Sequence, residues 1–245
     1  MTHLRTVAMS VAMASFAACA NLAPKAGEQT DAYVKALNVL SPPSAPDGKL
    51  DTAWEYYLRM HADCDDALPF QCELYERAFL DAYVAQLLVS VIGQSTKDIR
   101  ILGMTYEEFR KNADTISANN DAWLQATMRQ MGWFSIGTYG ESADAAAFLL
   151  IQHSGNEVWQ KQALADLTDR MASGETNPQN VAMLSDRIAL KEGALQKFGT
   201  QGGCTGNGTW KAHPSSRPEQ LNERRAAAGM GPIESYEASM GSKYC

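Results

Sequence analysis

The sequence predicts a mainly α-helical protein, a bundle-like globular domain with irregular loops and little or no sheet. Apolar residues recur three and four positions apart over most of the chain after residue 50, which is the spacing of amphipathic helices. Ser, Thr and Asn caps and terminal glycines separate these segments. With 245 residues and 45% hydrophobic composition, the chain is long enough to bury one large core or two small ones.

The N-terminus is typical of an export signal that ends in a lipid-modified cysteine. Arg5 precedes a modestly apolar run over residues 7–18, which is too short to cross a membrane as a helix. The segment Phe16-Ala17-Ala18-Cys19 resembles a bacterial lipobox, in which cleavage precedes the cysteine and its thiol is lipidated. The alternative is ordinary cleavage after Ala20, because Ala18-Cys19-Ala20 also has the A-x-A pattern.

These features predict how the protein is located and what it contacts. We expect a signal peptide at residues 1–18, a lipidated tether at residues 19–49, and a membrane partner that is reached through the lipid on Cys19. Ala20 is not the aspartate linked to inner-membrane retention, which favours the periplasmic side of the outer membrane. The net charge of −7 and the lack of a basic run argue against nucleic acid as a partner.

The cysteines also favour an exported protein. Without Cys19, four remain: Cys64, Cys72, Cys204 and Cys245. An even number in an oxidising compartment predicts two disulfides, and four cysteines allow three pairings. We favour Cys64 with Cys72, which closes a short loop, and Cys204 with Cys245, which ties the C-terminus to a glycine-rich segment. The alternative is four free buried thiols.

The remainder divides into a helical N-terminal part, residues 50–103, and a helical domain, residues 104–245. Apolar spacing predicts helices at 52–64 and 73–93 in the first part, and a shorter one at 31–40 within the tether. No internal repeat links the two parts.

Capping signals mark the helices of the second part in chain order. Thr105 with Glu108 forms a capping box before a helix at 106–116, and Gly132 ends a helix that starts at Asp121. The later starts are Ser142 for 143–153, Asn156 for 157–173, Asn177-Pro178 for 178–193, and a Ser216–Glu219 capping box for a last helix that Gly229 and Pro232 end. The one β-like run is the short segment 133–139.

Two polar residues end an otherwise apolar helix. Ala, Phe, Leu and Ile cover nearly the whole circumference of residues 143–153, so this helix is expected to be buried. Gln152 and His153 would then be buried as well, and each needs a hydrogen-bond partner.

A second helix carries two charges among apolar neighbours. Asp186 and Arg187 lie on the helix at 178–193, and adjacent positions point about 100° apart, so these two cannot readily pair with each other. Each therefore needs a different partner. The candidates are His153, Arg224, Arg225 or a ligand. The loop that follows contains Gln196, Thr200, Gln201 and several glycines, which suits close approach of a ligand and equally suits a plain surface turn.

Four segments together resemble a bacterial family of unknown function, the domain of unknown function family 6624. They are "GWFSIGTYG", "LLIQHSG", "LSDRIALKEGALQKFGTQ" and "NERRAAAGMGPIESY", in the family's order over roughly residues 115–237. The resemblance implies that Gln-His, Asp-Arg, Gln-x-[Tyr/Phe]-Gly-Thr-Gln and Arg-Arg positions recur. Phe198 stands where many relatives have tyrosine, and Phe134 replaces a more usual proline. The resemblance brings no reaction.

Two functional hypotheses follow. In the first, the protein is a small-ligand-binding or scaffold lipoprotein of the cell envelope, and its polar cluster is structural or grips a ligand. In the second, it is a hydrolase-like enzyme on a small anionic or envelope substrate, with His153 as general acid/base, Asp186 orienting the ring, and Arg187 and Arg224 holding the anion. The candidate ligand-binding residues are Gln152, Arg187, Gln196, Gln201, Arg224 and Arg225.

Other chemistries lack their motifs. Only His61, His153 and His213 remain after signal removal, and there is no H-E-x-x-H or C-x-x-C, so no metal or other cofactor is expected. The sequence has no G-x-S-x-G for a serine nucleophile and no Gly-Lys-Ser/Thr ending for a phosphate loop. Whether the protein is an enzyme stays open at this point.

Overall fold

A computed structural model describes residues 35–36, 38–39, 69–89, 91, 99–206 and 208–245. The expected signal peptide, the Cys19 anchor, Cys64 and the helix at 52–64 lie outside the described residues. The chain divides into two compact units, Met1–Trp133 and Phe134–Cys245. In both units the described residues are mainly helical, with two short two-stranded sheets, and the predicted fold class is confirmed. The predicted division into residues 50–103 and 104–245 stays a prediction.

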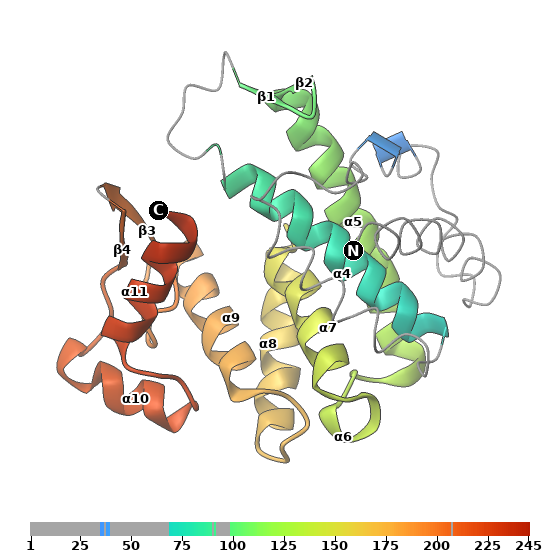
Figure 1. Cartoon of the computed structure of the whole chain (residues 1–245). Helices are drawn as coiled ribbons and strands as arrows, with labels where there is room; N and C mark the ends of the chain where they lie inside the picture. The colour runs from blue at the N-terminus through green and yellow to red at the C-terminus, as the bar shows by residue number, and fades with distance from the viewer. Residues whose placement is uncertain (1–34, 37, 40–68, 90, 92–98, 207) are drawn as a thin grey trace, which may run out of the picture. The chain divides into compact units, whose positions relative to one another are not determined.

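The first unit contains helices α4 (Pro69–Val89) and α5 (Tyr106–Met131) and a two-stranded sheet of β1 (Arg100–Ile101) and β2 (Met104–Thr105) (Figure 1). The predicted capping box is present: the Thr105 hydroxyl accepts from the Glu108 amide at 3.1 Å, and the Glu108 carboxylate accepts from the Thr105 amide at 2.9 Å. The two helices predicted at 106–116 and 121–132 are one continuous helix, α5.

The interface of α4 and α5 has an apolar end and a polar end. At the apolar end, Leu80 and Tyr83 of α4 belong to one buried cluster with Phe109 and Ile116 of α5. At the polar end, Arg77 is 6% exposed and donates to the side-chain oxygens of Asn119 and Asn120 at 2.9 and 3.0 Å. The Arg77 guanidinium also pairs with Glu73 at 2.7 Å, so the buried cation is neutralised and hydrogen-bonded.

The second unit begins with a short helix, α6 (Ile136–Tyr139), and three longer helices, α7 (Glu141–His153), α8 (Glu157–Met171) and α9 (Pro178–Lys191). Figure 1 shows the three longer helices side by side. One Asp144 oxygen, at the start of α7, accepts from the Asn177 amide at 3.0 Å and from the Asn180 side chain at 2.8 Å, at the start of α9. Helices α7 and α9 therefore run in the same direction, and α8 runs against both.

The caps of the three longer helices agree with the sequence at two of three positions. The Asn156 side chain accepts from the Trp159 amide, and the Asn177 side chain accepts from the Gln179 amide with Pro178 in the first turn, as predicted. The Ser142 cap is wrong: α7 begins at Glu141, and Gly140, at φ 84°, takes the N-cap position. A positive φ is open to glycine, which lets the chain turn directly from α6 into α7.

The β-like run at 133–139 is not a strand. It contains α6, and its aromatic residues Trp133 and Phe134 are 3% and 1% exposed. These side chains are buried individually beside a helix start, whereas the alternation in the sequence suggested a pleated surface. The Ile136 amide donates to the Glu175 carbonyl at 3.1 Å, which fixes this turn against the loop before α9.

The C-terminal part combines the predicted helix that ends before Gly229 with a hairpin and a terminal helix that the sequence did not predict. Strands β3 (Gly202–Gly206) and β4 (Thr209–Ala212) form an antiparallel hairpin, and a 3-10 turn, η1 (Pro218–Gln220), leads into α10 (Leu221–Ala227). Beyond Pro232, where the helices were expected to stop, α11 (Ile233–Tyr244) packs against β4.

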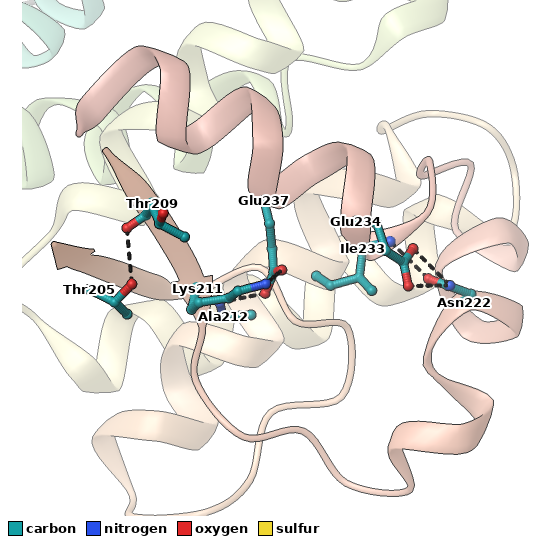
Figure 2. Close-up of polar contacts among 8 residues, drawn as sticks. All are labelled: Thr205, Thr209, Lys211, Ala212, Asn222, Ile233, Glu234 and Glu237. Atoms are coloured by element: carbon teal, nitrogen blue, oxygen red, sulfur yellow. Dashed lines mark hydrogen bonds and ion pairs between the residues drawn. The ribbon is translucent and has the colours of Figure 1, made fainter. Parts of the chain in front are cut away.

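Helix α11 is tied to its neighbours by two of its carboxylates and by a disulfide. Glu237 binds the Lys211 ammonium at 2.6 Å and the Ala212 amide at 3.0 Å, both on β4. Glu234 accepts from the Asn222 side chain of α10 at 3.2 Å (Figure 2). The predicted Cys204–Cys245 disulfide is present, with Cα atoms 5.7 Å apart. Cys72 is disulfide-bonded as well, and Cys64, its expected partner, lies outside the described residues.

The Ser216–Glu219 capping box is wrong. The Ser216 amide donates to the Gln196 carbonyl at 2.8 Å, and Gln196 pairs with Ser215 in a parallel bridge. This pairing with a distant segment replaces the local cap. Arg217 then takes a left-handed conformation, at φ 45°, before the 3-10 turn.

No helix in the described part of the chain combines the length and the apolar character needed to cross a membrane.

Candidate functional site

The candidate site is organised around the carboxylate of Asp186, which is fully buried on α9. It accepts from the backbone amides of Lys197 at 2.6 Å, Phe198 at 3.0 Å and Thr200 at 2.9 Å. The Thr200 hydroxyl adds a further hydrogen bond at 3.0 Å. Several amide donors on one carboxylate stabilise its charge. Asp186 thus fastens residues 196–201, hereafter the 196–201 loop, to the helical core.

The two candidate arginines hold the same loop by its carbonyl oxygens. Arg225 is 1% exposed and donates to the carbonyls of Phe198 at 2.7 Å and Gly231 at 2.8 Å. Arg224 donates to the Lys197 carbonyl at 2.8 Å. Its other two nitrogens donate to the carbonyls of Ser216 and Arg217 at 2.5 and 3.2 Å.

Gln196 closes the loop on itself. Its side chain is fully buried; the amide nitrogen donates to the Gln201 and His213 carbonyls, and the amide oxygen accepts from the Gln201 amide at 3.0 Å. The side chain therefore acts as an extra peptide group between two strand-like segments. We call Asp186, Gln196, Arg224 and Arg225 the loop frame.

The structure does not assemble the catalytic pair expected from the sequence. Asp186 makes its hydrogen bonds to the 196–201 loop, so it does not orient the ring of His153. A buried carboxylate needs several donors, and the amides of a loop a few residues away supply them at lower entropic cost than a distant side chain. Likewise, each of the three guanidinium nitrogens of Arg224 donates to a backbone carbonyl, so this side chain helps to hold the loop.

The remaining candidates lie towards the C-terminal ends of α7 and α9. Gln152 is 8% exposed, as expected, whereas His153 is half-buried. Asn180 of α9 contacts Asp144 of α7, and Arg187 follows Asn180 by two helical turns on the same side of α9. Two turns after Asp144, α7 reaches Ile151, the residue before Gln152. Gln152 and Arg187 therefore lie at the same height. Neither His153 nor Arg187 is without an interaction partner.

Gln201 is joined to this group through Thr200. Its side-chain nitrogen donates to the Thr200 hydroxyl at 3.1 Å, and that hydroxyl donates to Asp186. Since Asp186 precedes Arg187 on α9, the structure brings Gln201 towards the part of α9 that carries Arg187.

Sequence reasoning missed Gln160 and Lys191. The Gln160 side chain of α8 is fully buried and donates to the Ile151 and Gln152 carbonyls at the end of α7, at 3.0 and 3.1 Å. Lys191 of α9 donates to the other end of the same amide at 2.9 Å. The available signal was spacing: Gln160 shares the buried face of α8 with Ala163 and Leu167.

Tyr236 of α11 was also missed. Its hydroxyl donates to the Thr200 carbonyl at 3.1 Å, and the Arg225 guanidinium lies 4.8 Å from its ring centre. Burial raises the pKa of Tyr236, and burial lowers the pKa of Arg225. Both shifts reflect loss of water around the loop frame.

In the described part of the chain, no three His, Cys, Asp or Glu side chains lie close enough together to form a metal site.

Comparisons with known proteins give a family but no activity. No curated protein and no solved structure matches the chain. One family model matches residues 104–245, a longer stretch than the resemblance at roughly 115–237, and it includes the loop frame as well as Gln152 and His153. The chain therefore belongs to the family of unknown function DUF6624.

Proposed function

We propose that this protein is an exported, lipid-anchored protein of the bacterial cell envelope that works as a small-ligand-binding or scaffold module. One observation carries the choice of binding over catalysis: Asp186, the residue that would orient a catalytic His153, is committed to the 196–201 loop. A loop held by a buried carboxylate and two guanidinium groups is preorganised, which lowers the entropic cost of binding.

The exported location rests on the N-terminal sequence and is supported by the cysteines. The Phe16–Cys19 segment supplies the lipobox pattern. The Cys204–Cys245 disulfide and the bonded Cys72 agree with an oxidising compartment, because disulfides persist there and are rare in the cytosol.

The roles divide between the frame and the ligand-facing residues. The frame sets the position of the loop, and Gln152, His153, Arg187 and Gln201 supply the polar groups at the ends of α7 and α9. An enzyme of the hydrolase type would need a different orienting group for His153, and none of the Asp186 hydrogen bonds provides it.

The location is tested by the mass of the protein recovered from the membrane fraction. We expect a mature N-terminus at Cys19 that carries acyl chains, and we expect Cys19→Ser to release the protein from the membrane. A mature chain that starts after Ala20 and carries no lipid would refute the proposed lipid anchor on Cys19.

The binding role is tested by comparing His153→Gln with Asp186→Asn. If Asp186 builds the frame, Asp186→Asn lowers the free energy of unfolding and His153→Gln leaves it nearly unchanged. Equal losses would contradict a frame role that belongs to Asp186 and not to His153.

A further inference from the structure

Two buried polar atoms lie at the turn from α7 into α8 without a hydrogen-bond partner in the described part of the chain. They are Oε1 of Gln152 and Nε1 of Trp159, in side chains that are 8% and 9% exposed. We call residues 152–160 the α7–α8 corner. The two atoms are complementary, because an amide oxygen only accepts a hydrogen bond and an indole N–H only donates one.

The rest of this corner is well satisfied. The Trp159 amide donates to the Asn156 side chain, and the Asn156 amide donates to the Ser154 hydroxyl, each at 3.0 Å. The Gln160 side chain occupies the carbonyls of Ile151 and Gln152. The two unsatisfied atoms are therefore not a sign of a loosely built turn.

The same contacts join the end of α7 to the start of α8, where Gln152 and Trp159 lie. Gln160 is the residue after Trp159, and its side chain reaches the Gln152 carbonyl at 3.1 Å. Trp159 and Gln152 are thus held on adjoining elements across one tight turn. His153 follows Gln152 and is half-buried, which places the corner near the surface.

Leaving such atoms unpaired is costly. A buried donor or acceptor that loses its partner costs roughly 1–3 kcal/mol, and native proteins rarely keep one without water or a ligand. Replacement of Gln152 by an apolar residue would remove the cost of its unpaired Oε1. The corner therefore has the chemistry of a site that is completed by a molecule with both a donor and an acceptor.

We propose that the α7–α8 corner is a subsite for a secondary amide, with Gln152 Oε1 accepting the amide N–H and Trp159 Nε1 donating to the amide carbonyl. The proposal rests on the binding role proposed above and specifies its ligand class. The flat indole offers an apolar surface of the kind that a planar amide packs against.

Charged groups fit the corner less well than an amide. A carboxylate or phosphate presents only acceptors, so it would pair with Trp159 Nε1 and leave Gln152 Oε1 without a donor for as long as that oxygen faces the corner. An ammonium presents only donors and would leave Trp159 Nε1 unpaired. A neutral amide is the ligand that pairs both unsatisfied atoms at once, because it offers one donor and one acceptor.

The test uses the mature chain with ¹⁵N-labelled tryptophan. Trp159→Phe assigns the indole signal of Trp159, and Trp210, in β4, serves as an internal reference. The protein is titrated with N-methylacetamide and, separately, with methyl acetate, which has nearly the same shape but no N–H. We expect a saturable shift of the Trp159 indole proton with the amide and little with the ester.

Gln152→Leu provides the matched variant, because it removes the acceptor and leaves no buried polar side-chain atom at position 152. Loss of one hydrogen bond predicts a five- to tenfold weaker amide affinity in this variant. Equal shifts with amide and ester, or an amide response that Gln152→Leu does not weaken, would overturn the proposal. So would an indole proton that keeps a water contact unchanged by the amide, since the corner would then hold water alone.

The two proposals can fail separately. A silent Trp159 signal together with a large loss in Asp186→Asn would refute the amide subsite and leave the frame in place. A negligible loss in Asp186→Asn would refute the frame, whatever Trp159 reports.

Discussion

Asp186 accepts hydrogen bonds from both the backbone amide and the side-chain hydroxyl of Thr200, at 2.9 and 3.0 Å, so that one residue of α9 holds one residue of the 196–201 loop by two bonds. The same carboxylate also holds Lys197 and Phe198. This relationship makes the carboxylate a structural centre, and it yields the first prediction.

Asp186→Asn should destabilise the protein by about 2–4 kcal/mol. The variant replaces one carboxylate oxygen with an NH2 group, and this group cannot accept the hydrogen bonds that the loop amides and the Thr200 hydroxyl donate. Urea denaturation of the mature chain measures the loss. Asp169→Asn, on the exposed side of α8, is the matched control and should change stability by less than about 0.5 kcal/mol. Similar midpoints for the two variants would contradict the structural role of Asp186.

Removal of the Cys204–Cys245 disulfide should destabilise the second unit by up to about 4 kcal/mol, from the entropy of closing a loop with a sequence separation of 41 residues. We expect the double variant Cys204→Ser, Cys245→Ser to lower the urea midpoint and to expose α11 to limited proteolysis. The Lys211–Glu237 pair is partly exposed and replaces little of this energy. Unchanged proteolysis of α11 would show that its packing on β4 is sufficient.

Glu76 on α4 should make stability fall as pH rises. Burial, reinforced by Glu73 and opposed by Arg77, raises the pKa of Glu76 from 4.5 to about 7. The unfolded chain therefore loses this proton first, and folding is weakened progressively between about pH 4.5 and 7, by roughly 2–4 kcal/mol when complete.

Glu76→Gln removes this titration. Urea midpoints at pH 5 and pH 8 should converge in the variant relative to the wild type, with the variant the more stable at pH 8. Glu107→Gln, an exposed position in the first turn of α5, is the control and should leave the pH dependence unchanged. A wild-type protein with no loss over this pH range would refute the raised pKa.

Gly202 should not tolerate a side chain, whereas its neighbour Gly203 should. A Cβ at Gly202 would fall on the Lys211 carbonyl oxygen and within 2.6 Å of the Trp210 ring, while a Cβ at Gly203 meets nothing within 4 Å. Gly202→Ala should cost about 1–3 kcal/mol or more through overpacking, and Gly203→Ala less than about 1 kcal/mol. Thermal denaturation of the two variants, side by side, decides the matter; equal effects would contradict the close approach at Gly202.

Local signals in the sequence predicted helix starts well and distant pairings poorly. The Thr105–Glu108 capping box and the Asn156 and Asn177 caps each involve residues within one turn of each other, so short-range chemistry suffices to form them. The Ser216–Glu219 box failed because the Ser216 amide is taken by Gln196, a pairing that exists only after the chain has folded.

For the candidate site, the sequence by itself determined which polar residues lie on helix faces that are otherwise apolar. Gln152 and Asp186 are polar groups on buried helix faces, and simple periodicity identifies both. The cysteine positions likewise favoured the Cys204–Cys245 disulfide among the three pairings that four cysteines allow, and this bond is present. Only the tertiary structure decided the partners: Asp186 accepts from the loop amides rather than from His153, and Gln152 Oε1 is buried without a hydrogen-bond partner among the described residues. The burial of a side chain follows from the spacing of apolar residues along its own helix. Its hydrogen-bond partner depends on how loops bring distant parts of the chain together, and no local pattern in the sequence encodes that arrangement.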